Sequence, residues 1–99
     1  MDLVAEVIRE KIYRRFNEEV PYMVKQETVS WNDTPSSLHI YQILHLMDIS
    51  YKKMLIGKAG SALSYIQKLS EQDLSDHFAK PVVIHFLFQE SPKLFNKFY

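Results

Sequence analysis

Apolar residues recur every three or four positions over residues 2–16, which is the spacing of an amphipathic helix. Asp2 stands where it can cap the start of that helix. The apolar positions predict the buried face: Leu3, Val4, Val7, Ile8, Ile12 and Phe16. The charged positions between them predict a solvated face with pairs four residues apart: Glu6, Arg9, Glu10, Lys11, Arg14 and Arg15.

Three later segments are rich in β-branched and aromatic residues, which is typical of strands. They cover residues 22–31, 38–47 and 82–88. The turn residues of "NDTPSS" at 32–37 join the first two segments, so we expect an antiparallel hairpin. The segment 38–47 is partly apolar at both odd and even positions, which predicts the central place in the sheet.

Two helices are predicted between the second and third strands, at residues 50–56 and 60–78. Ser50 is the expected cap of the first. The second should bury Ala62, Leu63, Ile66, Leu69, Leu74 and Phe78 and expose Glu71, Asp73 and Asp76. A helical connection makes the strands that it joins parallel and the crossover right-handed. The order α-β-β-α-α-β therefore predicts an α+β fold, with a three-stranded mixed sheet and helices packed on one face.

Length and composition narrow the class of protein. Ninety-nine residues suit one domain, which we place at 1–90, followed by a tail at 91–99. The chain has no cysteine, so it has neither disulfides nor thiolate metal sites. No apolar run reaches the roughly 18–20 residues of a membrane span. Twelve basic and twelve acidic residues give zero net charge, which by itself disfavours a nucleic-acid binder.

Both glycines of the chain, Gly57 and Gly60, fall between the two predicted helices. Gly57 can end the short helix in a left-handed conformation, and Gly60 can begin the long helix with its N–H groups open to a phosphate. Four lysines and no acid lie between residues 49 and 70: Lys52, Lys53, Lys58 and Lys68. This basic segment suits a nucleic-acid backbone. A tight helix–helix turn remains the alternative.

No arrangement of residues predicts catalysis or metal binding. The four histidines, His39, His45, His77 and His85, lack the close spacing of metal ligands. Ser61 and Ser64 have no histidine or aspartate at a spacing that would make either a nucleophile. The phosphate-binding pattern G-x-x-x-x-G-K-[ST] does not occur in the chain. We therefore expect no enzyme activity, no metal and no cofactor.

Three segments in the same order resemble the C-terminal type II KH domain of the Era GTPases: "VIREKIY", "EVPYMV" and "KKMLIGKAG". The resemblance covers roughly residues 6–88 and includes the Ile-Gly-x-x-Gly signature of KH domains. It departs at Ala59, where bacterial members usually have another loop glycine. The strand end at Trp31 and its turn look more like mitochondrial members, which predicts the mitochondrial matrix, with the bacterial cytoplasm as the alternative.

The resemblance implies binding of a single-stranded segment near the 3′ end of small-subunit ribosomal RNA during subunit assembly. It also implies a GTP-hydrolysing domain outside this chain, and we expect a monomer. A groove wall would come from Met54, Ile56, Leu63 and Ile66, some of which could equally be core. The implied RNA-binding residues are Lys52, Lys53, Ile56, Gly57, Lys58, Ala59, Gly60, Ser61 and Lys68. A protein-interaction module, in which the loop is only a turn and the aromatic tail docks a partner, is the alternative.

Overall fold

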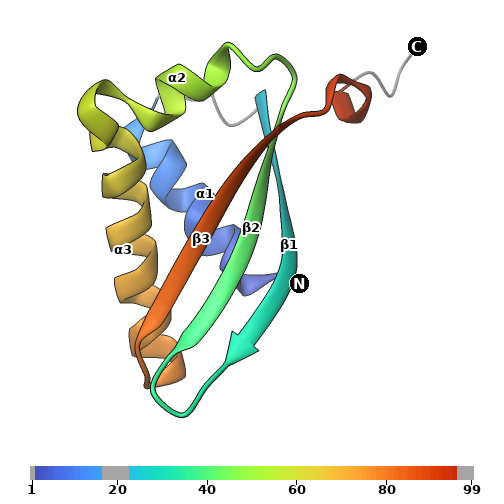
Figure 1. Ribbon diagram of the computed structural model, residues 1–99. Coiled ribbons are helices and arrows are strands. Elements are labelled where there is room, and N and C mark those ends of the chain that lie inside the picture. The colour runs from blue at the N-terminus through green and yellow to red at the C-terminus, as the bar shows by residue number, and fades with distance from the viewer. Residues whose placement is uncertain (1, 17–22, 96–99) are drawn as a thin grey trace.

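A computed structural model describes residues 2–16 and 23–95 of the protein (Figure 1). Within these residues, three α-helices and three strands follow one another in the predicted α-β-β-α-α-β order, together with the 3-10 turns η2 and η3. The elements are α1 (Leu3–Arg15), β1 (Val24–Asp33), β2 (Leu38–Leu46), α2 (Tyr51–Ile56), η2 (Lys58–Gly60), α3 (Ser61–Phe78), β3 (Val82–Glu90) and η3 (Pro92–Phe95).

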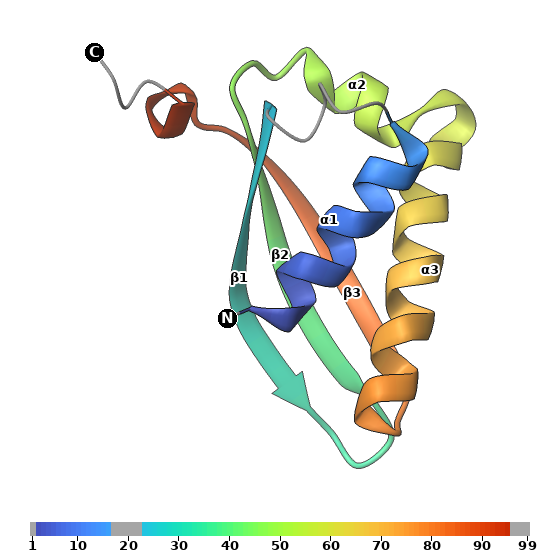
Figure 2. The same cartoon turned by 180° about the vertical axis from the view of Figure 1, so that it is seen from behind.

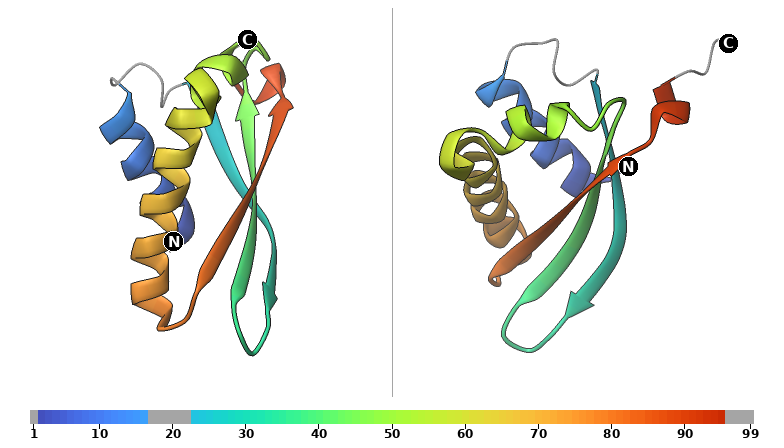
Figure 3. Two further views of the ribbon diagram at one scale, coloured as in Figure 1. Left: turned by 60° about the vertical axis from the view of Figure 1, so that its left-hand side comes forward. Right: turned by 45° about the horizontal axis from the view of Figure 1, so that its top comes forward.

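The sheet has the strand order β1-β2-β3, so β2 is central as predicted. β1 pairs antiparallel with β2, and β3 pairs parallel with β2 from Leu38↔Val82 to Leu46↔Glu90. Figures 1 and 2 show α1 and α3 on the same face of the sheet, and the left view of Figure 3 separates the helical layer from the strands. The predicted α+β fold is confirmed.

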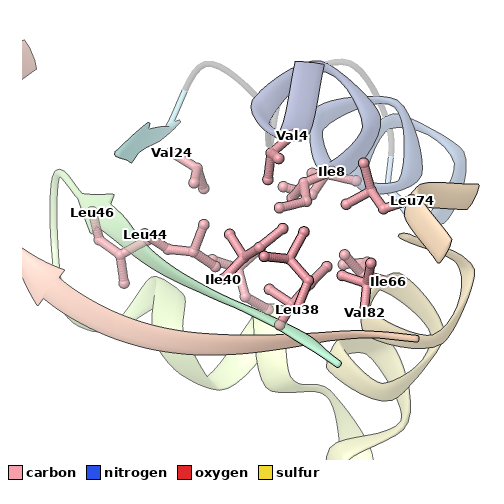
Figure 4. Close-up of a cluster of buried hydrophobic side chains, with 13 residues drawn as sticks. Val4, Ile8, Val24, Leu38, Ile40, Leu44, Leu46, Ile66, Leu74 and Val82 are labelled. Atoms are coloured by element: carbon pink, nitrogen blue, oxygen red, sulfur yellow. The ribbon is translucent and has the colours of Figure 1, made fainter. Parts of the chain in front are cut away.

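The core lies between that face of the sheet and the two long helices (Figure 4). Successive strand residues point to opposite faces, and the even-numbered residues of β2 are all buried. Asp2 caps α1 as predicted, because its carboxylate accepts a hydrogen bond of 3.2 Å from the Ala5 N–H. The core residues drawn from the helices are Val4, Ile8, Ile12, Leu55, Ile66 and Leu74.

The first strand differs from its predicted bounds. It begins at Val24 and ends at Asp33, and the pairing with β2 shifts between Thr28 and Ser30. Such a bulge adds one residue to a strand and changes which side chains face the core. Trp31 consequently packs edge-on against Phe78 of α3, with ring centroids 5.6 Å apart. Residue 22, the predicted start, lies outside the described residues.

Ser50 does not cap α2, contrary to the prediction, since its side chain makes no capping hydrogen bond. Asp48, two residues earlier, instead accepts the hydrogen bonds at the start of this helix. Its carboxylate accepts a hydrogen bond of 2.9 Å from the Ser50 N–H, and its carbonyl accepts one of 3.1 Å from Tyr51. The hydrogen bond from the Ser50 backbone is the main cause of a lowered pKa at Asp48.

Lys11 was predicted on the solvated face of α1, and that prediction is wrong. Its side chain is only 2% exposed, and its amine lies 2.5 Å from the Asp73 carboxylate of α3, with Glu10 as a second partner. Burial lowers the pKa of Lys11, but the hydrogen bonds to Asp73 and Glu10 outweigh burial and raise it overall. The bond from Lys11 lowers the pKa of Glu10 in turn. The ion pair thus joins α1 to α3.

None of the described helices is both long and apolar enough to cross a bilayer.

Candidate nucleic-acid interface

The segment Gly57–Gly60, called the GKAG loop below, turns the chain sharply between α2 and α3 (Figure 1). The Gly57 N–H donates to the Lys53 carbonyl at 2.9 Å and so ends α2. The Gly60 N–H donates to the Gly57 carbonyl at 3.1 Å and closes the turn. The two glycines therefore interrupt what would otherwise be one helix, as the sequence predicted.

Gly57 has φ 78° and ψ 173°, a combination open essentially only to glycine. The positive φ was predicted, but the extended ψ differs from the left-handed helical conformation that we expected. A Cβ at this position would lie 2.7 Å from the Ala62 Cβ and 2.8 Å from the Ala62 nitrogen. Gly57 is thus required both by its dihedral angles and by the close approach of α3.

Gly60 has different surroundings. It adopts the left-handed conformation, with φ 75° and ψ 10°, immediately before α3, and no side chain caps that helix end. A Cβ at Gly60 would meet no atom within 4 Å, so the backbone here faces open space. An anion can approach a helix start of this kind closely, and the helix dipole favours it.

Ala59 also has a positive φ, of 54°, which is unfavourable for a residue with a Cβ. We expect Ala59→Gly to stabilise the protein by about 1 kcal/mol, because glycine adopts this conformation without steric cost. Urea unfolding followed by circular dichroism measures the change. Ala5→Gly, inside α1, is the matched control and should destabilise by about 1 kcal/mol. An unchanged midpoint for Ala59→Gly would contradict the expectation.

The lysines around the loop are accessible. Lys52, Lys53, Lys58 and Lys68 are all exposed, as is Ser61 at the start of α3. The Lys52 amine lies 5.5 Å from the centre of the Phe88 ring, so α2 reaches the end of β3. A hollow of about 350 Å³ in α2 and the residues before it is lined by Ile49, Ser50, Lys52, Lys53 and Ile56.

A groove of about 490 Å³ runs between the start of α3 and β3, the edge strand that adjoins α3. We call it the α3–β3 groove. Of the predicted wall residues, Leu63 lines it, whereas Ile66 is 2% exposed and belongs to the core. Met54 is 39% exposed on α2 and Ile56 is half-buried; neither lines this groove. The full lining is Tyr41, Leu63, Gln67, Ile84, His85, Phe86 and Leu87.

Side chains of α3 bind the backbone of β3 along its free edge. Glu71 accepts a hydrogen bond of 2.9 Å from the Ile84 N–H, and Gln67 donates one of 3.0 Å to the Ile84 carbonyl. Ser75 accepts one of 2.9 Å from the Val82 N–H. Glu71 was predicted on the solvated face of the helix, and that prediction is wrong for a physical reason: the crossover places it against the strand edge.

Backbone groups alternate in direction along a strand. The N–H and carbonyl of Phe86 therefore point to the same free edge as those of Ile84. Phe86 lines the groove, whereas the side chains of Gln67 and Glu71 are bonded to the backbone of Ile84. Sequence reasoning missed Gln67 and Phe86. The parallel crossover was the one signal that could have indicated them, because it must bring the first turns of the helix beside the last strand.

Three of the four histidines, His39, His45 and His85, lie in hydrogen-bonded contacts on the sheet, whereas His77 is exposed on α3. His45 is 8% exposed, and its ring nitrogens lie 2.8 Å from the Ser91 hydroxyl and 2.8 Å from the Glu27 carboxylate. His39 and His85 contact each other across β2 and β3, with ring nitrogens 2.9 Å apart. Within residues 2–16 and 23–95, no three histidine, cysteine or acidic side chains are arranged to hold a metal ion.

No family model matches the chain. Its relatives include GTPase Era of Agrobacterium fabrum (strain C58 / ATCC 33970), 37% identical over 87 residues, and GTPase Era of Sinorhizobium medicae (strain WSM419), 34% identical over 87 residues. The matched part is 87% of this chain but only 27% and 28% of those proteins. The chain thus spans little more than a quarter of the length of the curated relatives it matches.

Two solved structures share the fold. One is a variant of Era from Aquifex aeolicus bound to GDP and aluminium fluoride, and the other is Era in complex with MgGDPNP and nucleotides 1506–1542 of 16S ribosomal RNA. Each superimposes with a TM-score of 0.86 at 26% identity and covers 96% of this chain. This chain covers 33% of the first structure and 32% of the second.

The fold order, the mixed sheet and the GKAG loop together define a type II KH domain. The chain belongs to the Era family, in which it matches the C-terminal KH domain and not the GTPase domain. The relatives named above are bacterial, so the mitochondrial expectation finds no support among them.

Proposed function

We propose that this KH domain binds single-stranded RNA, and that its target is the 3′-terminal region of small-subunit ribosomal RNA during assembly of the subunit. The observation that carries the proposal is the open backbone at Gly60. It lies near the exposed lysines and near the α3–β3 groove. The solved Era complex with nucleotides of 16S ribosomal RNA supports the choice of target.

The proposed binding mode assigns two tasks to the site. The GKAG loop takes phosphates on its backbone N–H groups, while bases enter the α3–β3 groove against Leu63, as KH loops clamp about four nucleotides. Phe86 offers an N–H and a carbonyl at the free edge for a base. The remaining residues add charge, hydrogen bonding or apolar contact near the loop: Lys52, Lys53, Ile56, Lys58, Ser61 and Lys68.

The wider context is proposed from the relatives. A protein of their length would carry a GTPase domain outside this chain, and the domain described here would extend over residues 1–90, followed by the tail 91–99. The bacterial cytoplasm then takes precedence over the mitochondrial matrix as the compartment. We further propose that the domain acts as a monomer and needs no cofactor to bind RNA.

Salt dependence tests the proposal. We expect the domain to bind a 12-nucleotide unpaired RNA, with an affinity that falls as salt rises because phosphate contacts release counterions. Fluorescence anisotropy at two salt concentrations gives the slope, and the same nucleotides closed into a hairpin are the matched control. Equal affinity for the hairpin, or no dependence on salt, would contradict the proposal and favour the protein-interaction alternative.

A further inference from the structure

The outer face of the sheet carries a row of aromatic rings to which the proposed clamp assigns no base. The even-numbered residues of β2, together with Val82 and Ile84 of β3, are buried against the helices. The odd-numbered residues of both strands therefore point away from the helices. Tyr41 of β2 lies directly opposite His85 of β3 in the parallel register. Their rings are stacked, with centroids 4.4 Å apart and planes inclined by 11°.

Hydrogen bonds hold His85 in place. Its Nε2 lies 2.9 Å from Nδ1 of His39, and Nε2 of His39 lies 3.0 Å from the Ser37 hydroxyl. The two histidine rings are inclined by only 18° with centroids 5.2 Å apart, so they lie edge to edge in nearly one plane. An ordered ring loses little conformational freedom when a flat ligand stacks on it.

The row is continuous with the proposed RNA site. Tyr41 and His85 line the same groove as Leu63 and Gln67, although the first two come from the outer face of the sheet and the others from α3. The groove therefore passes over the edge strand β3. Leu87, the outward residue next to His85 on this strand, is 55% exposed and also lines the groove.

We propose that the bound RNA strand continues over the β3 edge and stacks one base on the Tyr41–His85 pair. This inference rests on the proposed function and adds a second contact to it. Aromatic rings bind unpaired bases of any sequence by stacking, so the contact would extend the site without fixing the base. β2 and residues 82–89 of β3 carry no acidic residue, so no fixed negative charge on these segments opposes the backbone.

The test uses the 12-nucleotide unpaired RNA with 2-aminopurine placed at each position in turn. In the parent protein, one position beyond the four nearest the loop should lose fluorescence on binding, because the base stacks. Tyr41→Thr and His85→Thr should each lower the affinity about tenfold and abolish that signal. His85→Phe keeps a flat ring and should retain both. His77→Ala and Tyr13→Leu remove exposed or partly exposed rings elsewhere and should change neither.

The outcomes separate this inference from the proposed function. If a GKAG loop variant loses RNA binding while Tyr41→Thr and His85→Thr, shown to be folded by circular dichroism, bind like the parent, the stacking contact is overturned and the RNA-binding function stands. A loss at His85→Thr that His85→Phe does not restore also overturns stacking. If the parent protein binds no RNA, both fall.

Discussion

Replacing Lys58 and Ala59 together by aspartate is expected to weaken RNA binding strongly. The change places two carboxylates where a phosphate must approach and removes one cation, a difference of three charges at the GKAG loop. Loss of a phosphate contact and reversal of the local field should lower the affinity on the order of 100-fold at moderate salt. Anisotropy titration of the 12-nucleotide RNA measures it.

The structure explains why this variant should remain folded. Both side chains are exposed, and the positive φ of 54° at Ala59 is one that aspartate tolerates better than most residues. Lys93→Asp with Leu94→Asp is the matched control, since it makes the same charge change at two exposed residues of η3. Circular dichroism checks folding. Parent-like RNA binding by a folded loop variant would refute the phosphate clamp.

The arrangement of the elements could be predicted because independent features of the sequence indicate it. The apolar spacing of residues 3–16 permits only a helix of this length, and the helical segment before β3 makes that strand parallel to β2. The bounds of β1 could not be predicted to the residue. The bulge near Val29 depends on pairing with β2, and a single strand does not reveal its partner's register.

Part of the candidate site was equally accessible from the sequence, since Gly57 and Gly60 are the only glycines and both take positive φ. Contacts between distant elements could not be predicted, either in the fold or in the site. Lys11 reads as a surface charge until α3 brings Asp73 beside it, and Glu71 reads as solvated until β3 does the same. A buried charge needs a partner, but the pattern of one helix cannot show which element supplies it.

Gly57→Ala is expected to cause the largest loss of stability among the alanine substitutions in the loop. Its φ of 78° with ψ of 173° lies in a region essentially closed to alanine, and the added Cβ would lie 2.7 Å from the Ala62 Cβ and 2.8 Å from its nitrogen. Strain and overpacking together should cost roughly 3 kcal/mol or more. The free energy of unfolding of native proteins is about 5–15 kcal/mol, so the variant should be only marginally folded at 25 °C.

Gly60→Ala is the matched control for this prediction. Its φ of 75° is similar, but its ψ of 10° lies in the left-handed region that alanine can reach, and a Cβ there meets no atom within 4 Å, so the substitution should cost only about 1–2 kcal/mol. Adding Ala62→Gly to Gly57→Ala removes the contact with the Ala62 Cβ but not the contact with its nitrogen. Glycine inside α3 itself costs about 1 kcal/mol, so the double variant should recover little of the loss. The midpoints of urea unfolding of the parent, the two single variants and the double variant measure these losses. Equal losses for Gly57→Ala and Gly60→Ala would contradict the extra cost that we assign to the ψ of 173° and to the close approach of α3 at Gly57.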